Sequence, residues 1–262
     1  MNGITPWVGG KKQLRGEIVK RFPMNYKRYI EVFGGGGWVL FYKRRGKDFE
    51  VFNDINGLLV NLYRCVRENP DELIEKLRYV LNSREDFEYV KKLLKREINA
   101  PPVQRAAWYY QILRQSYGAT LESYNAQPND MWRNFPLIQK ASRRLAKVII
   151  ENQDFETLIK HYDHPTSFFY CDPPYHDTEG YYKDIGEDGF TEKDHIRLRD
   201  TLLSIDGKFL LSYNDDDFVR ELYDFPGIQI DSVTRTNGFT GKEFKEVIIA
   251  NYDMHESQLS LF

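Results

Sequence analysis

The sequence predicts an α/β protein built on a mainly parallel sheet, interrupted by a helical segment. The continuous apolar run at 167–171 is typical of a strand that is buried on both faces of such a sheet. Residues 29–42 have the pattern of a strand, four glycines and the start of a helix. Beyond them the apolar spacing becomes helical, with no strong strand pattern for a long stretch. We therefore expect a discontinuous α/β domain (1–57 and 148–255), a helical insert (58–147) and a tail (256–262).

Composition sets limits on the class of protein. With 262 residues and 41% hydrophobic content, the chain can bury one substantial core and a smaller lobe. The net charge of −2 argues against a protein that merely coats nucleic acid. A local basic face is still compatible with this net charge. Cys65 and Cys171 have neither metal-like nor disulfide-like spacing, which predicts a reducing cytoplasm. No apolar run reaches membrane-spanning length, so we expect no membrane partner.

The strand at 167–171 ends in Asp172, Pro173, Pro174 and Tyr175. Two consecutive prolines cannot continue a strand ladder, so they hold the loop extended at the edge where open α/β sheets bind ligands. Such a loop suits transfer to an aromatic amine. The Asp172 carboxylate and the Pro173 carbonyl can accept its two N–H bonds, and Tyr175 offers a π-face to an unstacked base. The alternative is an ordinary turn in which Asp172 serves as a cap.

An aromatic residue, two glycines and a cation follow one another near the N-terminus, as Trp7, Gly9, Gly10 and Lys11. This set suits a zwitterionic amino acid, because Lys11 can face its carboxylate and Trp7 can cover its body. The alternative is an ordinary glycine turn with an anchoring tryptophan, and taken alone this motif favours that alternative.

The next motif is a strand at 29–33 followed by four glycines and a helix-like pattern from Trp38. A glycine turn between strand and helix is the nucleotide-binding corner of a doubly wound fold, although the G-x-G-x-x-G spacing is absent. The following strand ends at Asp54, which is placed to accept bonds from both ribose hydroxyls of an adenosine ligand. Alternatively, Asp54 caps the next helix.

The helical insert should contain helices near 58–66, 73–81 and 86–97, and a further one after Pro102. Its second half is rich in side chains that suit nucleic acid, since Arg, Gln and Asn can read base edges and helical cations suit phosphates. The predicted DNA-binding residues are Arg114, Gln115, Ser116, Tyr117, Tyr124, Asn125, Arg133, Asn134, Lys140, Arg143 and Arg144. The alternative for the cations at 140–147 is a solvated helix face.

The α/β pattern returns with a strand that ends near Asp154 and Phe155, which can bracket an adenine ring. The long polar segment 175–190 predicts a flap over the site. Thr191 and Asp194 form a capping box for the next helix. A strand (208–214), a helix (216–223) and a final strand pair (228–236 and 245–252) should complete the domain.

Taken together, the order PWxGGK, ExFGGGG, NDIN, helical insert, NQDF and DPPY resembles the α-group (Dam-type, D12 class) DNA adenine-N6 methyltransferases over nearly the whole chain. The resemblance implies a Rossmann-like sheet that binds S-adenosylmethionine and releases S-adenosylhomocysteine. It implies a catalytic loop at 172–175 and target recognition by the helical insert. The implied cofactor-binding residues are Trp7, Lys11, Phe33, Gly35, Gly37, Asp54, Asp154 and Phe155, together with Gly10 of the first motif. Gly34 and Trp38 depart from the family, which more often has an apolar and a small residue there.

The resemblance implies site-specific methyl transfer to a flipped-out adenine in double-stranded DNA, by an orphan methylase or within a restriction-modification pair. We expect direct transfer without a covalent intermediate, because Cys171 should point into the sheet by strand alternation. We expect no metal. The alternatives are methylation of RNA adenine or a glutamine amide, and a non-catalytic DNA-binding protein with a relic domain.

The sequence ends in an apolar tail of Gln258, Leu259, Ser260, Leu261 and Phe262. QLSLF resembles the pentapeptide by which bacterial replication proteins bind the sliding clamp, and this implies the clamp as a second partner. A bacterial or phage-infected bacterial cell would then be the setting. The alternative is a tail that folds back on its own core or frays.

Overall fold

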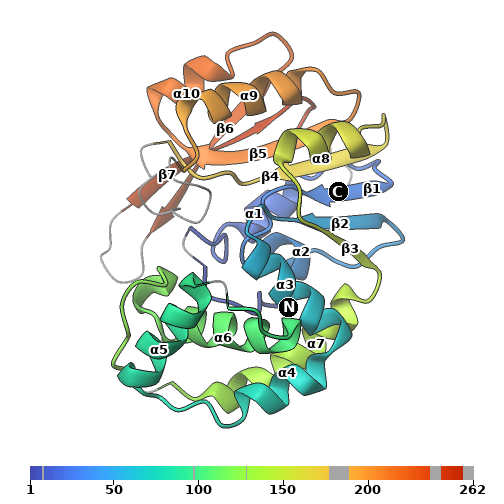
Figure 1. Ribbon diagram of the computed structural model, residues 1–262. Coiled ribbons are helices and arrows are strands. Elements are labelled where there is room, and N and C mark those ends of the chain that lie inside the picture. The colour runs from blue at the N-terminus through green and yellow to red at the C-terminus, as the bar shows by residue number, and fades with distance from the viewer. Residues whose placement is uncertain (8, 97, 128, 177–188, 237–242, 256–262) are drawn as a thin grey trace.

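The computed structural model describes residues 1–7, 9–96, 98–127, 129–176, 189–236 and 243–255. It contains a seven-stranded sheet in the order β3-β2-β1-β4-β5-β7-β6 (Figure 1). Strands β1 to β5 run parallel to one another, whereas β7 is antiparallel to both β5 and β6. The strands are β1 (Arg28–Glu31), β2 (Phe49–Asn53), β3 (Val148–Glu151), β4 (Ser167–Cys171), β5 (Lys208–Asn214), β6 (Gln229–Thr236) and β7 (Glu243–Ala250). The predicted α/β class and the final antiparallel strand pair are confirmed.

The central strand β4 is buried at all of its positions, as expected for an apolar run inside a parallel sheet. It lies between β1 and β5, and β1 has β2 on its other side. The strand order therefore reverses between β1 and β4, which makes this pair the topological switch point of the sheet. The glycine turn after β1 and the double-proline loop after β4 both leave the sheet there, so the fold brings these two motifs together.

Helices cover both faces of the sheet (Figure 1). One face packs against α8 (Phe155–Tyr162), α9 (Glu192–Leu203) and α10 (Asp217–Leu222) through a buried apolar cluster. The other packs against α1 (Arg15–Lys20), α2 (Trp38–Tyr42) and α3 (Gly57–Glu68). Alternation along β4 divides the two cores, because Phe168 and Tyr170 belong to one cluster and Phe169 and Cys171 to the other.

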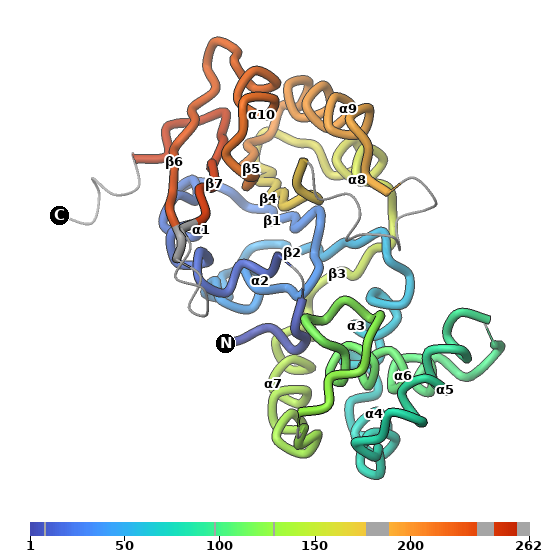
Figure 2. The backbone as a smooth tube through the Cα atoms, turned by 90° about the vertical axis from the view of Figure 1, so that its left-hand side faces the viewer, coloured from blue at the N-terminus to red at the C-terminus, as the bar shows by residue number. Residues whose placement is uncertain are grey.

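The chain between β2 and β3 is helical in the part that the structure describes. After α3 come α4 (Pro70–Leu77), α5 (Arg84–Lys95), α6 (Pro102–Gln115), η1 (Tyr117–Ala119), η2 (Met131–Asn134) and α7 (Phe135–Leu145). Helix α6 is the centre of this group and contacts α3, α4 and α5. Figure 2 shows α4 to α7 on one side of the molecule, opposite β6 and β7. The buried residues of α4 and α7 and most of those of α6 belong to the core under the sheet, whereas Phe87 and Val90 of α5 form a separate small cluster with Ile112 of α6.

Local capping explains where several helices begin. Ser83 accepts a bond from the Asp86 amide at the start of α5, and the predicted capping box of Thr191 and Asp194 is present at α9. The alternative role of Asp54 as a helix cap is wrong, because Asn56 caps α3 by accepting bonds from the amides of Leu58 and Leu59. The Asp54 carboxylate instead accepts bonds from the backbone amides of Gly35 and Asn56.

Two predicted features fall outside the described residues. Residues 177–188 of the predicted flap and the whole tail Gln258–Phe262 are among them. Among the helices that the structure describes, none combines the length and apolarity needed to cross a membrane.

Candidate active site

A cavity of about 380 Å³ lies at the carboxyl ends of β1 and β4. Its walls come from the N-terminal turn, the glycine turn, the loop after β2, the loop after β4, the strands β5 and β7, and residues 113 and 119–121 of the helical segment. The volume is within the range of small-molecule sites. Sheet and helical segment thus share one cavity, at the switch point where the strand order predicts a ligand.

The carboxylate of Asp172 is fixed at the edge of this cavity by two donors. Lys11 Nζ lies 2.7 Å from Asp172 Oδ1, and Ser212 Oγ donates to the same oxygen at 2.9 Å. Burial raises the pKa of Asp172 above its usual range, while the ammonium of Lys11 acts in the opposite direction. Within the described residues, neither bond uses Oδ2. One carboxylate oxygen is thus anchored and the other can accept a substrate N–H.

Lys11 is buried between several acceptors. Besides Asp172, its ammonium donates to the Gly9 carbonyl at 3.0 Å and lies 4.0 Å from Oε2 of Glu246. It also lies 4.6 Å from the ring centroid of Tyr175, a distance suited to a cation–π contact. The sequence predicted that Lys11 faces the carboxylate of a ligand. In the structure Lys11 lines the cavity and binds the carboxylate of Asp172, and its contact with a ligand stays a prediction.

Pro173, Pro174 and Tyr175 all line the cavity, as predicted for the catalytic loop. The Tyr175 hydroxyl donates to Glu246 Oε2 at 2.6 Å. Burial raises the pKa of Tyr175 well above its usual value, so the phenol remains protonated and acts as the donor. The orientation of the Tyr175 ring is therefore set by a residue of β7.

Several predicted cofactor residues also line the cavity. Asp54 accepts bonds from the Gly35 amide at 2.8 Å and from the Asn56 amide at 2.9 Å. Gly35 has φ +47°, and a Cβ atom there would lie 2.6 Å from Nε1 of Trp7. Only glycine allows this approach, since both the backbone and the space exclude a side chain. Trp7, Phe33, Gly35 and Asp54 all line the cavity.

The remaining glycines differ from one another. Gly10 lines the cavity, and a Cβ atom there would lie 2.6 Å from Nε1 of Trp38. The unusual Trp38 therefore fits because its neighbours lack side chains. Gly37 does not line the cavity. It precedes α2 with φ +62°, and a Cβ atom there would lie 2.9 Å from the ring of Phe41, so Gly37 turns the chain into the helix.

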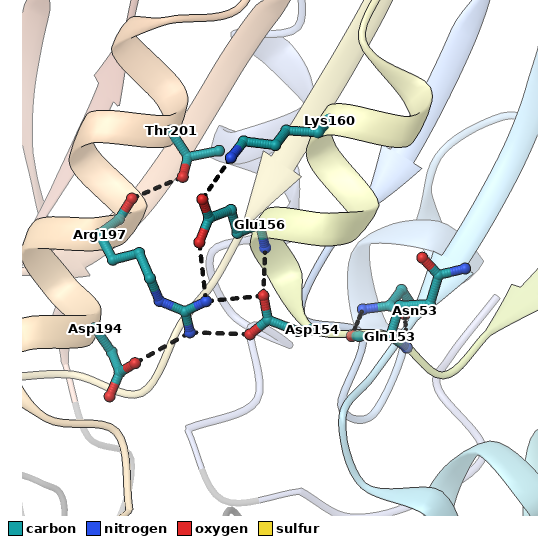
Figure 3. Close-up of polar contacts among 8 residues, drawn as sticks. All are labelled: Asn53, Gln153, Asp154, Glu156, Lys160, Asp194, Arg197 and Thr201. Carbon is teal, nitrogen blue, oxygen red and sulfur yellow. Dashed lines mark hydrogen bonds and ion pairs between the residues drawn. The ribbon is translucent and has the colours of Figure 1, made fainter.

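Asp154 and Phe155 lie outside the wall of the cavity. Asp154 caps α8 through the Glu156 amide, and Arg197 of α9 binds both of its carboxylate oxygens, at 2.8 and 2.9 Å (Figure 3). An adenine amine, the predicted partner of Asp154, would therefore compete with Arg197 for the same carboxylate oxygens. Phe155 is nearer to the site, because its ring centroid lies 5.7 Å from that of Phe33, which lines the cavity.

Sequence reasoning missed four polar residues at the site, namely Glu31, Ser212, Asn214 and Glu246. Glu31 and Glu246 are each 2% exposed, and both line the cavity. Burial raises the pKa of Glu31 to about 8, although the Tyr29 hydroxyl donates to it at 2.6 Å. A signal in the sequence could have identified both glutamates. Each is an acidic residue at a strand position that alternation assigns to the core.

Three of the predicted DNA-binding residues are buried in the helical segment. Gln115 donates to the Leu81 carbonyl at 2.8 Å, and Ser116 lies over the last turn of α6. Asn134 accepts a bond from Arg114 Nη2 at 2.6 Å. These side chains hold the helices together in this structure, and they do not present a surface to DNA.

Arg144 is a correction to the predicted basic face. Its guanidinium binds both carboxylate oxygens of Glu50, at 2.6 and 2.7 Å, and the two side chains are only 9% and 5% exposed. Helical spacing of cations indicated a phosphate-binding surface, but the side chain points inward to β2. Lys140 and Arg143 on the same helix are exposed, as are Tyr117 and Arg133.

A tight loop from α6 carries the rest of the predicted DNA contacts. Ser116 and Tyr124 form a β-bridge at its base, and the Asn125 amide donates to the Gln115 carbonyl at 2.7 Å. At its tip, Ala119 and Leu121 have φ values of +59° and +63°, which are rare for residues with side chains. Both residues line the cavity. Backbone strain of this kind is concentrated at functional sites.

Comparison with known proteins agrees with this geometry. The family model for D12 class N6 adenine-specific DNA methyltransferases matches residues 7–237. A type II methyltransferase of Lactococcus lactis subsp. cremoris (M1.LlaDCHI) is 31% identical over 275 residues, covering 95% of each chain. The type II methyltransferase M.MjaIII of Methanocaldococcus jannaschii is 28% identical, over 94% of this chain and 97% of its own. A DNA adenine methylase of Haemophilus influenzae is 28% identical, over 83% and 81%. The chain therefore belongs to the D12 class of N6 adenine-specific DNA methyltransferases, a family that implies a DNA substrate and a methyl donor of the S-adenosylmethionine type.

Proposed function

We propose that this chain transfers a methyl group from S-adenosylmethionine to the N6 amine of an adenine that has left the stack of double-stranded DNA, producing S-adenosylhomocysteine. The observation that carries the proposal is the anchored carboxylate of Asp172 in the wall of the shared cavity. A carboxylate beside a proline carbonyl offers the two acceptors that an exocyclic amine requires.

The side chains of the cavity fit the methyl donor. Trp7 and Phe33 offer aromatic surface, Asp54 offers carboxylate oxygens, and the backbone at Gly35 can be approached closely. This set suits an amino acid joined to a nucleoside. When bound, the donor supplies an electrophilic methyl group on a sulfonium centre. Because Gly37, Asp154 and Phe155 lie away from the cavity wall, the other predicted cofactor residues are the main candidates for direct contact.

In the proposed mechanism, Asp172 and Pro173 act on the amine. Asp172 Oδ2 and the Pro173 carbonyl accept the two N–H bonds and draw the nitrogen lone pair out of conjugation with the ring. The ammonium of Lys11 favours the ionised form of Asp172 against the effect of burial, and the Tyr175 ring stacks on the base. We infer that transfer is direct, without a covalent intermediate and without a metal. Cys171 is buried in the core, and burial raises its pKa well above the usual value, which opposes a role as nucleophile.

We further propose that the helical segment 58–147 serves as the target-recognition lobe. Residues 1–57 and 148–255 then form the catalytic domain. The strained loop between Ser116 and Tyr124 carries Tyr117 to the surface beside the cavity, where it can contact the duplex around the unstacked base. The exposed cation Arg133 suits phosphate contacts. Site specificity would then arise in this loop and its neighbours.

The test uses purified protein, labelled S-adenosylmethionine and duplex DNA from a methylation-deficient host. Label should enter the DNA, and single-molecule sequencing should find N6-methyladenine within one short motif. Parallel reactions with RNA and with protein substrates distinguish the alternatives. Label confined to RNA or protein would contradict the proposal, and cofactor binding without transfer to any substrate would favour a relic domain.

We also propose that the tail Gln258–Phe262 binds the bacterial sliding clamp in the cytoplasm, on the strength of its sequence alone. The tail lies outside the described residues. Removing 258–262 should abolish binding to immobilised clamp while methylation of naked DNA is unchanged. Equal clamp binding by the shortened protein would contradict this proposal.

A further inference from the structure

We propose that Glu246 of β7 is a positioning residue for the methyl-transfer loop, acting through Tyr175 and Lys11. The inference rests on the proposed function and concerns how the loop at 172–176 is held. Among the described residues, no hydrogen bond or ion pair joins Glu246 to Asp172 or Pro173, the two predicted amine acceptors. Glu246 contacts their neighbours, since its Oε2 atom accepts a bond from the Tyr175 hydroxyl at 2.6 Å and lies 4.0 Å from Lys11 Nζ.

The loop is attached to two antiparallel strands at three points. Ser212 and Asn214 are two residues apart on β5, so they face the same side of the sheet, and Asn214 pairs in register with Glu246 of β7. Ser212 donates to the Asp172 carboxylate, and Asn214 donates to the His176 carbonyl at 3.3 Å. Glu246 accepts a bond from the hydroxyl of Tyr175, which lies between Asp172 and His176 in the loop. These three side chains form a polar row that holds the start, middle and end of the loop.

The face of β7 that carries Glu246 is otherwise apolar toward the end of the strand. Ile248 and Ala250, which face the same side of β7, belong to the buried core. A buried carboxylate is costly unless it is paired, and a phenol needs only a neutral acceptor. Lys11, whose ammonium lies 4.0 Å away, is a cation that can balance this negative charge. One ammonium lies between two carboxylates, 2.7 Å from Asp172 and 4.0 Å from Glu246.

This arrangement couples the position of the ring to the position of the catalytic carboxylate. Lys11 lies over the face of Tyr175 while it binds Asp172, and Glu246 contacts both Lys11 and Tyr175. Removing Glu246 breaks the hydrogen bond to the phenol and takes away a carboxylate beside the ammonium. Because the reacting groups must be aligned closely, a small shift of the loop lowers kcat more than it weakens binding.

The charge of Glu246 also acts on Asp172, whose pKa it raises. Removing that charge should lower the pKa of Asp172 and extend activity to lower pH, since the ionised carboxylate is the active form. The titratable and charged groups around Asp172 are Lys11, Glu31, Tyr170, Cys171, Tyr175, Tyr213 and Glu246.

The experiment compares Glu246→Ala, Glu246→Gln and Tyr175→Phe with the unaltered protein. Glu246→Ala should lower kcat by about 10²-fold, with KM for duplex and for methyl donor changed by less than about threefold. Glu246→Gln keeps an acceptor for the phenol but loses the charge, so it should retain more activity and move the acidic limb of the kcat profile to lower pH. Glu246→Ala and Tyr175→Phe should be non-additive when combined, because they break the same bond.

Two further measurements separate positioning from a general loss of structure. Glu50→Gln is the matched control, since Glu50 is an equally buried strand glutamate that pairs with cations away from the cavity. It should lower the thermal midpoint without changing kcat. Fluorescence of 2-aminopurine at the target base, measured without methyl donor, should rise in the unaltered protein and change in Glu246→Ala. Wild-type kcat in Glu246→Ala, or an equal loss in Glu50→Gln, would overturn the inference. Absence of DNA methylation by the unaltered protein would instead overturn the proposed function.

Discussion

The ammonium nitrogen of Lys11 lies 2.7 Å from Oδ1 of Asp172, and this contact joins the first motif of the chain to the loop after β4. Both side chains are largely buried, at 5% and 19% exposure. Burial raises the pKa of Asp172, and the ammonium of Lys11 opposes this rise. The N-terminal turn therefore supplies a positive charge that favours the ionised carboxylate.

The first prediction concerns this charge. Lys11→Met should raise the pKa of Asp172 further, because the opposing ammonium is removed. Since transfer requires the ionised carboxylate, the acidic limb of kcat should move to higher pH, and activity should recover as pH rises. Lys11→Arg preserves the charge and should show a smaller shift. The pH dependence of single-turnover rates checks this, and an acidic limb that stays unchanged in Lys11→Met would contradict it.

The second prediction concerns the approach of Trp7 to the glycine turn. Gly35→Ala should weaken methyl-donor binding by about tenfold or more, because a Cβ atom at φ +47° would meet Trp7 at 2.6 Å. Isothermal titration with S-adenosylhomocysteine measures the effect. Gly227→Ala is the matched control, since Gly227 has φ +88° with no atom within 4 Å of a Cβ. It should cost about 1 kcal/mol of stability and leave binding unchanged. Equal binding by both variants would show that the contact with Trp7 does not shape the site.

The third prediction concerns the ion pair of Arg144. Arg144→Met should destabilise the protein by about 2 kcal/mol or more, because it removes one partner of the buried Glu50 carboxylate. Lys43 remains 2.7 Å from Glu50 and limits the loss. Arg143→Met, at the exposed neighbouring position, should change stability by less than about 0.5 kcal/mol. Urea unfolding of both variants checks this. Equal stability of the two variants would contradict the structural role of Arg144 and favour the surface role that its helical spacing suggested.

The sequence predicted the parts of the site that depend on local pattern. Parallel strands bring their carboxyl ends to one edge, so the residues after β1, β2 and β4 meet there, including Phe33, Asp54 and Asp172. Strand periodicity and turn residues were enough to identify these elements. The same reasoning placed Tyr175 at the cavity, although it gave no partner for its hydroxyl.

The residues that were missed depend on pairing between distant segments. Glu246 reaches Tyr175 only because β7 pairs antiparallel with β5, a register that no local pattern specifies. Arg197, which binds Asp154, lies on α9, a helix that follows the catalytic loop in the chain. Helical spacing could not show which face of α7 is buried, and the partner of Arg144 lies on β2.

The most direct test of the central claim is Asp172→Asn, which preserves size and removes the charge. Both proteins would be expressed in a methylation-deficient host, and the host DNA would be mapped for N6-methyladenine by single-molecule sequencing. The unaltered protein should modify nearly every copy of one short motif. Asp172→Asn should reduce modification at that motif by on the order of 10³-fold, while binding of S-adenosylhomocysteine in vitro stays within about threefold. Equal modification by the two proteins would contradict the role of Asp172.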